Sequence, residues 1–438
     1  MSRDGAWVVT IGDELLRGEI VDTNKAFLAE RLLRLDLETR RQLTVADEPE
    51  PIHEVLRSAA RSARVVLVSG GLGPTRDDIT TAVAARAFGR TLVQDPVELE
   101  RIRGFFRSLG REMSENNAKQ AEFPDGAEIL PNPLGTAPGF MLEAEGALLF
   151  FTPGVPRELQ RMVDEQILPR LATRLGDGGV VRSGLLRTFG LGESNLDREL
   201  GDLALDDPAV TIGFRTQFPD NLVRVVVRAP TEAEAEHKLR DLLGRIQERL
   251  GDLVLGEGER SLEEIVAEQL RARGHTLALA ESCTGGLLAS RLTDVPGSSE
   301  FLRLSVVAYA NTAKQRELGV TAAVLEAHGA VSEAVARQMA EGIRQRAAAD
   351  LAVATTGVAG PGGGTPAKPV GTLWLALADA QGSVARRYSL MRERSRNKWL
   401  ASQLALDWIR RRLLGLELPE QGFPRLGRPS ASPQESRR

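Results

Sequence analysis

Cysteine is almost absent from this sequence: the 438 residues contain one, Cys283. An intramolecular disulfide and a metal site made of several cysteines are therefore both excluded. Aromatic residues are also scarce, at 4% of the chain, so Val, Leu, Ala and Ile have to fill the hydrophobic cores. Only four histidines are present, which leaves few candidates for the most common general base of enzymes.

The chain also lacks a strong excess of charge and a long hydrophobic run. Its formal net charge is -4 with both signs mixed, which gives no general attraction to nucleic acids or anionic membranes. No apolar run approaches the roughly 20 residues that span a bilayer, and the first residues lack the apolar stretch of a signal peptide. We expect a cytoplasmic protein that has neither a membrane nor a nucleic acid as its partner.

The length of the chain predicts about two to four domains at roughly 100–200 residues each. In residues 1–175, expected strands at 6–11, 39–45 and 64–69 alternate with expected helices. This alternation predicts an α/β domain with a mostly parallel sheet that is covered by helices on both faces.

The remainder of the chain divides into three segments. Residues 176–255 begin with a glycine-rich break at 176–179 and predict a small α+β module. Strands and helices alternate again in residues 256–416, which predicts a C-terminal α/β domain. Residues 417–438 are rich in Pro, Gly, Ser and Arg, so we expect a disordered tail.

The clearest chemical motif of the C-terminal domain is Ala-Glu-Ser-Cys-Thr-Gly-Gly at residues 280–286, between an expected strand and an expected helix. Small residues allow a tight turn there, and a helix start leaves backbone N–H groups free. Such groups bind a phosphate or a developing oxyanion. Ser282 can present its hydroxyl as a nucleophile at this turn, provided that a base activates it.

The identity of that base is the next question. His53, His237, His275 and His328 all lie in positions typical of surface or structural residues. Lys314 falls in the first turn of an expected helix that follows a strand, near the edge where strand ends converge. Burial and nearby positive potential can lower the pKa of such a lysine enough for it to act as a base.

Local sequence alone leaves other interpretations open. A serine at such a position is often only a helix cap, and most lysines are solvated surface residues. Cys283 is an alternative nucleophile, although a lone cysteine between a strand and a helix is more often a small buried residue.

Further loops follow the expected strands. The glycine-rich segment at 356–365 suits close backbone approach to a ligand, and Arg394 can hold an anion. With Tyr-Ala-Asn-Thr-Ala-Lys at 309–314 and His-Gly-Ala-Val-Ser at 328–332, these motifs resemble the CinA C-terminal domain in the same order. That domain is known in its stand-alone form as nicotinamide mononucleotide deamidase.

The resemblance implies a Ser/Lys dyad in which Ser282 is the nucleophile and Lys314 is the base, with no cofactor. Backbone N–H groups near residues 284–286 would stabilise the oxyanion, and Arg394 would bind the substrate phosphate. Lys398 replaces the arginine expected in many relatives, so that position is given no phosphate role. The implied substrate-binding residues are Thr284, Gly285, Gly286, Tyr309, Asn311, Thr356, Gly357, Gly360 and Arg394.

The N-terminal domain carries polar motifs after its expected strands, at residues 12–18 and 70–80. Ligands of open α/β sheets bind beyond the carboxyl ends of the strands, where glycines admit phosphates and carboxylates bind divalent ions. The candidate metal or acid–base residues are Asp13, Glu14, Asp22, Asp77 and Asp78. Asp22, Asp77 and Asp78 are equally compatible with helix capping.

These motifs, with Asn-Ala-Lys-Gln at 117–120 and the segment at 132–139, resemble the molybdopterin-binding MogA/MoaB fold and the CinA N-terminal domain. The resemblance implies ADP-ribose pyrophosphatase activity with a divalent metal such as cobalt, magnesium or manganese. Its implied ligand contacts are Gly70, Gly71, Gly73, Thr75, Asn117, Lys119 and Thr136.

The middle module resembles the KH-type domain of the same family. KH domains that bind nucleic acid use a GXXG loop, whereas the GXXG spacing at 176–179 precedes the first strand and carries an acidic residue. We therefore expect a spacer or dimerisation role, and the family implies a homodimer.

Three hypotheses about function follow. The first is a bifunctional hydrolase of pyridine-nucleotide recycling that acts on nicotinamide mononucleotide and ADP-ribose. The second keeps the deamidase and makes the N-terminal domain a non-catalytic pterin-binding module. The third is a competence-associated protein that binds nucleic acid, against which the charge balance and the position of the GXXG spacing count.

Overall fold

The computed structural model describes residues 5–176, 179–204, 207–391 and 393–419. Most of the tail expected to be disordered, and two residues of the break at 176–179, lie outside these ranges. The chain forms two compact units, Met1–Arg182 with Val227–His237, and Ser183–Val226 with Lys238–Arg438. In the described part of the chain, no helix is both long enough and apolar enough to cross a membrane.

The N-terminal domain is built on a six-stranded sheet in the order β2-β1-β3-β8-β7-β6. The first four strands in that order pair with one another in parallel, as the sequence predicts. β7 pairs antiparallel with β8, and β6 pairs antiparallel with β7. The strands are β1 (Ala6–Ile11), β2 (Thr39–Val45), β3 (Val65–Ser69), β6 (Glu128–Leu130), β7 (Gly139–Ala144) and β8 (Ala147–Thr152). The hairpin from β7 to β8 turns at Glu145 and Gly146, whose positive φ values suit the twist of antiparallel strands.

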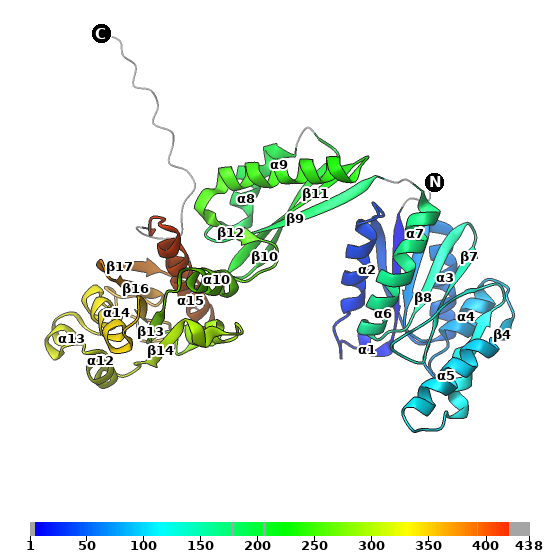
Figure 1. The fold of residues 1–438 in the computed structure, drawn as a ribbon, viewed down its shortest axis with the longest axis horizontal. Helices are drawn as coiled ribbons and strands as arrows, with labels where there is room; N and C mark the ends of the chain where they lie inside the picture. Colours follow the sequence, from blue (N-terminus) through cyan, green and yellow to red (C-terminus); the bar gives the residue numbers. More distant parts are fainter. Residues whose placement is uncertain (1–4, 177–178, 205–206, 392, 420–438) are drawn as a thin grey trace, which may run out of the picture. The chain divides into compact units, whose positions relative to one another are not determined.

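Helices cover both faces of this sheet (Figure 1). One apolar cluster packs the strands against α3 (Pro49–Ser62) and α4 (Thr80–Ala87). A second packs them against α2 (Thr23–Leu33) and a closing helix made of α6 (Pro156–Met162), η2 (Val163–Ile167) and α7 (Leu168–Leu175). The sequence did not predict α4, because its Ala- and Thr-rich residues lack large apolar side chains at helical spacing.

Shorter elements complete the N-terminal domain. α1 (Asp13–Leu16) directly follows β1. Between β3 and β7 lie β4 (Leu92–Gln94), α5 (Pro96–Ser108), η1 (Glu115–Ala121) and β5 (Glu122–Pro124), with β4 and β5 paired as a separate two-stranded sheet.

The middle module contains a four-stranded sheet in the order β10-β11-β9-β12. Its elements are β9 (Val180–Thr188), α8 (Glu193–Leu200), η3 (Gly201–Leu203), β10 (Val210–Gln217), β11 (Asp220–Ala229), α9 (Glu232–Leu250), η4 (Gly251–Leu253) and β12 (Val254–Glu257). The sequence predicted the longer strands and both α-helices but not β12, which runs past the expected boundary at residue 255.

The C-terminal domain has a five-stranded sheet in the order β14-β13-β15-β16-β17. β13 (Leu277–Glu281), β14 (Leu302–Val307) and β15 (Leu351–Gly357) are parallel, whereas β16 (Thr372–Asp379) and β17 (Gly382–Ser389) continue the sheet antiparallel. The carboxyl ends of the three parallel strands meet at one edge, so the loops that follow them gather there.

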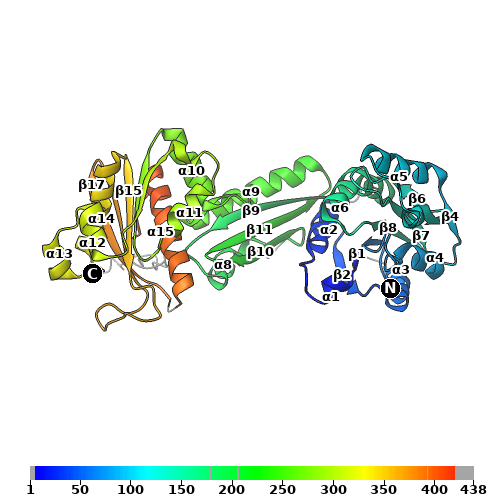
Figure 2. The same cartoon turned by 90° about the horizontal axis from the view of Figure 1, so that it is seen from below.

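Three helices lie on each face of this sheet (Figure 2). One face carries α12 (Asn311–Leu318), α13 (Ala322–His328) and α14 (Glu333–Ala347). The other carries α10 (Leu262–Arg273), α11 (Leu287–Thr293) and α15 (Arg394–Leu414), with the short η5 (Ser298–Glu300) before β14. The sequence predicted the second set but neither α13 nor α14.

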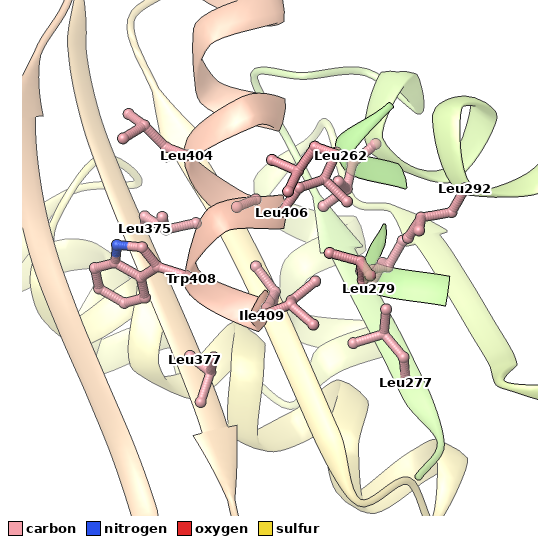
Figure 3. Packing of buried hydrophobic residues seen from close by; sticks show 14 of the residues in the cluster. Leu262, Leu277, Leu279, Leu292, Leu375, Leu377, Leu404, Leu406, Trp408 and Ile409 are labelled. Carbon is pink, nitrogen blue, oxygen red and sulfur yellow. The ribbon is translucent and has the colours of Figure 1, made fainter. Parts of the chain in front are cut away.

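Large apolar side chains lock α15 onto its face of the sheet. Figure 3 shows Leu404, Trp408 and Ile409 of α15 packed towards leucines of β13 and β16. Trp408 is fully buried and donates from Nε1 to the hydroxyl of Tyr388 at 2.8 Å. This packing fixes where the first turn of α15 lies, and that turn reaches the carboxyl edge of the sheet.

Candidate active site

The motif at residues 280–286 forms the turn between β13 and α11. Gly285 and Gly286 have φ values of 62° and 90°, in the left-handed region where a side chain causes strain. The N–H of Ser282 donates to the carbonyl oxygen of Thr355 at 3.0 Å, which ties the start of the turn to β15. The turn therefore holds Ser282 at the carboxyl edge of the sheet.

Ser282 and Lys314 lie together at this edge. The distance from Ser282 Oγ to Lys314 Nζ is 3.1 Å, and the two residues are 9% and 1% exposed. Lys314 Nζ also donates to the carbonyl oxygens of Ala308 at 2.8 Å and Tyr309 at 3.2 Å. Because carbonyls only accept, a neutral amine would give them its two hydrogens and turn its lone pair towards the Ser282 hydroxyl.

The surroundings of Lys314 favour that neutral form. Burial lowers the pKa of Lys314 below its ordinary value of 10.5. Among the described residues, no carboxylate forms an ion pair with Lys314, and the opposing charge interaction with Cys283, which raises the pKa, is smaller than the effect of burial. Burial and positive potential were expected to lower this pKa together, and burial is the cause that the structure supplies.

Glu281 holds the turn in place, a role that was not predicted from the sequence. It is fully buried, and its carboxylate accepts hydrogen bonds from the N–H groups of Gly286 (2.9 Å), Leu288 (3.1 Å) and Ala289 (2.8 Å). These are the free N–H groups at the start of α11, where a negative charge is stabilised. An acidic residue just before a helix start was the available sequence signal.

This arrangement changes the expected oxyanion donors. The N–H of Gly286 is already bound to Glu281, and that of Gly285 donates to the carbonyl oxygen of Ser282 at 3.2 Å. Within the described part of the turn, the N–H groups of Cys283 and Thr284 donate to no carbonyl or side-chain oxygen. Of the N–H groups expected near residues 284–286, those of Gly285 and Gly286 are therefore engaged, and that of Thr284 remains free together with that of Cys283.

Two threonines expected to contact the substrate are occupied within the protein. Thr284 is fully buried, and its hydroxyl lies 2.8 Å from that of Thr355. Thr356 is 1% exposed and donates to the carbonyl oxygen of Ala330 at 2.8 Å. Both side chains hold loops together in this structure.

The thiol of the alternative nucleophile, Cys283, lies on the α15 side of the sheet. It packs beside the apolar cluster on that side, and a Cβ placed on Gly357 would lie 3.3 Å from Sγ. Burial raises the pKa of the Cys283 thiol to about 12, so the reactive thiolate is disfavoured.

The exposed rim of the site comes from three segments. Tyr309 is 60% exposed, and its hydroxyl accepts a hydrogen bond from Arg394 at 2.8 Å. Arg394 also donates to the carbonyl oxygen of Gly360 at 3.0 Å, which links the first turn of α15 to the glycine-rich loop. Asn311 lies exposed at the start of α12, on the same edge.

The first turn of α15 adds two residues that were not assigned to the substrate. Asn397 is buried and donates from Nδ2 to the carbonyl oxygens of Ala359 (2.9 Å) and Met391 (3.0 Å). The ammonium of Lys398 lies beside the turn at residues 280–286, 3.7 Å from a Cβ placed on Gly285. Lys398 is therefore a candidate anion contact that the sequence analysis had set aside.

In the N-terminal domain, the glycine loop packs tightly against its neighbours. Gly70 and Gly71 have φ values of 112° and 68°. A Cβ on Gly70 would overlap the carbonyl oxygen of Ile11, and one on Gly71 would overlap the hydroxyl of Thr80. Gly73 lies against the carboxylate of Asp78 in the same way. These glycines are needed for packing, whether or not a ligand is bound.

The remaining loop residues form a cluster around Thr75. Asp78 accepts hydrogen bonds from the N–H (2.8 Å) and the hydroxyl (2.6 Å) of Thr75, which also contacts Asp77. Lys119 donates to the carbonyl oxygens of Thr75 and Asp78. The hydrogen bond from Thr75 lowers the pKa of Asp77, so its exposed carboxylate stays charged.

A second acidic group lies nearby and includes Asp47, which the sequence analysis did not single out. Asp13 and Asp47 exchange hydrogen bonds between backbone N–H and carboxylate at 3.0 and 3.3 Å. Burial raises the pKa of Asp47, and the charges of Glu14, Asp13 and Asp77 add to that effect. Asp22 instead caps α2, where it accepts from the N–H of Lys25 at 3.2 Å.

These carboxylates do not form a ready-made metal site. Over the described residues, no group of three or more His, Cys, Asp or Glu side chains is arranged to hold a metal ion. Asp22 and Asp78 are engaged in capping and loop contacts. No catalytic step is therefore assigned to a metal.

Asn117 and Thr136 belong to loops held by other side chains. Asn117 is buried, accepts from the hydroxyl of Ser114 at 2.7 Å and donates to Gln120 at 3.0 Å. The carbonyl oxygen of Thr136 accepts from Arg101 at 3.1 Å, and Arg101 also binds two other carbonyls of that loop.

Comparison with known families divides the chain in three. Residues 7–173 match the probable molybdopterin binding domain, 183–256 the KH domain of damage-inducible protein CinA, and 259–413 the CinA C-terminal domain. A CinA-like protein of Geobacter metallireducens is 47% identical over 410 residues, covering 93% of this chain and 98% of the relative. The chain belongs to the CinA family.

Other relatives are similar over nearly the whole chain or over one part of it. A CinA-like protein of Geobacter sulfurreducens is 46% identical over 406 residues, covering 93% of this chain and 98% of its own. The solved structure of competence/damage inducible protein CihA from Agrobacterium tumefaciens is 37% identical, covers 35% of this chain and 93% of that one, and gives a TM-score of 0.34. The family matches confirm the predicted order of a MogA/MoaB-like domain, a KH-type module and a CinA C-terminal domain.

Proposed function

We propose that the C-terminal domain is an amidohydrolase that converts nicotinamide mononucleotide to nicotinic acid mononucleotide and ammonia. The observation that carries the proposal is the buried pair of Ser282 and Lys314, 3.1 Å apart. A lysine amine with a lowered pKa beside a serine hydroxyl can activate that serine without a histidine. Membership of the CinA family and the cations Arg394 and Lys398 beside the turn support the nucleotide substrate.

The first half of the proposed reaction forms an acyl-enzyme. Neutral Lys314 takes the proton of Ser282 Oγ while that oxygen bonds to the carboxamide carbon. The electron pair of the C=O bond moves onto its oxygen, which the N–H groups of Cys283 and Thr284 stabilise. Lys314 then gives its extra proton to the amide nitrogen, the C–N bond breaks and ammonia leaves.

The second half returns the enzyme to its starting state. Water attacks the ester carbon while Lys314 accepts one of its protons, and the same proton then restores the Ser282 hydroxyl as the acid departs. Arg394 and Lys398 would hold the phosphate through charge-assisted hydrogen bonds. The reaction needs no cofactor.

Ammonia release from nicotinamide mononucleotide by the full-length protein tests this mechanism. We expect Ser282→Ala and Lys314→Ala to lose at least about 10³-fold in kcat/KM, because each removes one of two groups that act as a unit. Cys283→Ala should stay within a few-fold of the wild type, since the pKa of that thiol is about 12.

Lys314→Arg is the matched control, because arginine keeps the charge but does not lose its proton in proteins. We expect it to be inactive, like Lys314→Ala. An active Ser282→Ala with an inactive Cys283→Ala would transfer the nucleophile to Cys283. Undiminished turnover by Lys314→Ala would remove the dyad altogether.

We also propose that the N-terminal domain cleaves ADP-ribose to AMP and ribose 5-phosphate. The match to a molybdopterin-binding domain and the acidic group of Asp13, Glu14, Asp47 and Asp77 support this assignment. Magnesium is commonly held by substrate phosphates with only one or two carboxylates, so a preformed set of ligands is not required. AMP release should depend on added cobalt, magnesium or manganese. No turnover with any of them would favour the non-catalytic pterin-binding module.

Two measurements on the full-length protein test two candidate partners, a second copy of the chain and single-stranded DNA. Light scattering should give twice the mass of one chain if the protein is a homodimer. Tight, salt-sensitive binding of single-stranded DNA would instead support the competing role in nucleic-acid binding, because phosphate contacts weaken steeply with salt.

A further inference from the structure

A groove of about 540 Å³ opens on the α14 face of the C-terminal sheet. Its walls are the His-Gly-Ala-Val-Ser segment, the first turns of α14, the loop at 367–368 and the ends of β16 and β17. Among the described residues that line it, none belongs to the Ser282–Lys314 pair or to the Tyr309–Arg394 contact. Its volume lies within the range of about 300–1,000 Å³ typical of small-molecule sites.

The charge of this groove, which we name the α14 groove, is positive. Arg337, Lys368 and Arg387 line it with one carboxylate, Glu333. Arg337 is paired with Glu333 at 3.0 Å. In the described part of the chain, neither Lys368 nor Arg387 forms an ion pair, so two positive charges remain uncompensated.

Both free cations are already oriented. Lys368 Nζ donates to the carbonyl oxygen of His328 at 2.6 Å, and Arg387 Nη2 donates to that of Ala367 at 3.0 Å. Each of these bonds uses one donor and leaves the others available for a ligand. A pre-oriented lysine and arginine are well suited to a phosphate group, which accepts several charge-assisted hydrogen bonds.

An aromatic ring lies next to these cations. Trp374 of β16 is the direct cross-strand neighbour of Arg387 and is half-buried, with part of its surface in the groove. An indole face stacks on a planar heterocycle, whatever the identity of the base. A ring and two cations in one groove match the two ends of a nucleotide.

We infer that the α14 groove binds a nucleoside monophosphate, with its phosphate on Lys368 and Arg387 and its base against Trp374. This is a second ligand site of the C-terminal domain, separate from the residues that hydrolyse the amide. The inference does not depend on the proposed deamidase reaction, and it gives the His-Gly-Ala-Val-Ser segment a role as part of the wall.

Equilibrium dialysis of radiolabelled AMP against the full-length protein tests the inference. Because the N-terminal domain is itself proposed to bind nucleotides, the number of AMP molecules bound per chain is the quantity to compare. We expect Lys368→Ala/Arg387→Ala to lose one equivalent or to bind it at least about tenfold more weakly, since two charged hydrogen-bond donors are removed. Trp374→Leu should weaken AMP several-fold but leave competition by ribose 5-phosphate unchanged.

Arg386→Ala is the matched control, because Arg386 is the adjacent arginine of β17 and faces the opposite side of the sheet. It should bind AMP as the wild type does. Photolabelling of the unaltered protein with 8-azido-AMP, followed by peptide mapping, should place a label in residues 367–388. Equal binding by wild type and the double variant, or labels only outside that segment, would overturn the inference.

Discussion

At the scale of single residues, the charge state of Lys314 decides whether Ser282 can be activated. Burial lowers the pKa of Lys314, while its carbonyl partners can accept hydrogen bonds from either the amine or the ammonium form. The neutral form is the active one in the proposed mechanism. The rate should therefore increase as the proton is lost.

The pH dependence of kcat/KM follows from the requirement for neutral Lys314. Activity should rise with pH and level off below the ordinary lysine pKa of 10.5, since burial moves the titration downwards. Ammonia release measured from neutral to alkaline pH gives the profile. A rate that falls as pH rises through this range would contradict a lysine base.

Glu281 predicts a separate effect on stability. Glu281→Gln replaces a carboxylate that accepts three backbone hydrogen bonds by an amide that has only one oxygen to accept them. We expect a loss of about 1.5–3 kcal/mol in the free energy of unfolding, from hydrogen bonds to a buried charged group. Urea unfolding measures it.

Glu268→Gln is the control for Glu281→Gln, because Glu268 is exposed and pairs only with Arg260. Exposed ion pairs contribute little, so the change should stay below about 1 kcal/mol. Equal effects of the two substitutions would remove the special role of Glu281.

The sequence predicted the meeting of Ser282 and Lys314 because both follow strands whose carboxyl ends share one edge. It did not predict the roles of Asp47, Glu281 or Lys398. Their importance depends on burial and on contacts with distant segments, which local patterns do not contain. Asp22 was expected either to bind a metal or act in acid–base chemistry, or to cap a helix. The structure shows that it caps α2.

At the scale of elements, α12 and α14 approach each other through backbone. Gly342 of α14 lies against the end of α12, where a Cβ would overlap the carbonyl oxygen of Leu318. Lys314 belongs to the same short helix α12. The absence of a side chain at residue 342 therefore allows the helix that carries the proposed base to pack closely.

Gly342→Ala should destabilise the protein by about 1–3 kcal/mol, the usual effect of overpacking, and lower kcat by moving α12. Gly244→Ala in α9 is the matched control, since nothing lies within 4 Å of its added Cβ. That change should add up to about 1 kcal/mol, because alanine favours a helix more than glycine does. Unfolding in urea and ammonia release are the measurements. Full activity in Gly342→Ala would contradict the argument.

The elements themselves were predicted where apolar side chains recur at regular spacing, as in α10 and α15. α14 was missed although its buried residues Val335, Met339 and Ile343 recur at helical spacing, so the signal for this helix was present in the sequence. The strand β6 was missed because it is only three residues long, and the six-residue strand β7 was also not predicted.

At the scale of the whole molecule, a buried polar network joins the middle module to the C-terminal domain within the second unit. Arg187 of β9 pairs with Asp220 of β11 at 2.9 Å, and Asp220 also contacts Gln403 of α15. Gln403 accepts a hydrogen bond from Arg291 of α11. The network therefore reaches α11 and α15, the two helices whose first turns border the turn at residues 280–286.

Asp220 makes this network sensitive to pH. Burial raises the pKa of Asp220 to about 6, although Arg187 opposes the shift. The folded protein therefore holds a proton between about pH 4 and 6 that the unfolded chain releases, so this group adds stability as pH falls through that window and loses it as pH rises. The contribution is of the order of 2–3 kcal/mol.

Asp220→Asn should remove this dependence of the free energy of unfolding on pH. Urea unfolding between pH 4 and 7, followed by tryptophan fluorescence, measures it, because Trp374, Trp399 and Trp408 lie in the second unit. Asp241→Asn, at an exposed position of α9, should keep the wild-type slope. Identical slopes in all three proteins would show that Asp220 does not titrate in this range.

The order of the domains could be predicted from the sequence, because each carries its own motifs. The division of the chain into two compact units could not be predicted from the sequence. Residues 183–226 of the middle module group with the C-terminal domain, and Phe189 of the module packs in the C-terminal core. Such packing between segments is visible only in the folded chain.

The single thiol of the chain has a practical consequence. Because the pKa of Cys283 is about 12 and no second cysteine exists, alkylating reagents such as iodoacetamide find almost no thiolate at physiological pH. Under the proposed mechanism, electrophiles that trap an activated hydroxyl, such as boronic acids and fluorophosphonates, react with Ser282 instead. Selective covalent inhibitors of the proposed amide hydrolysis should therefore be sought among serine-directed compounds.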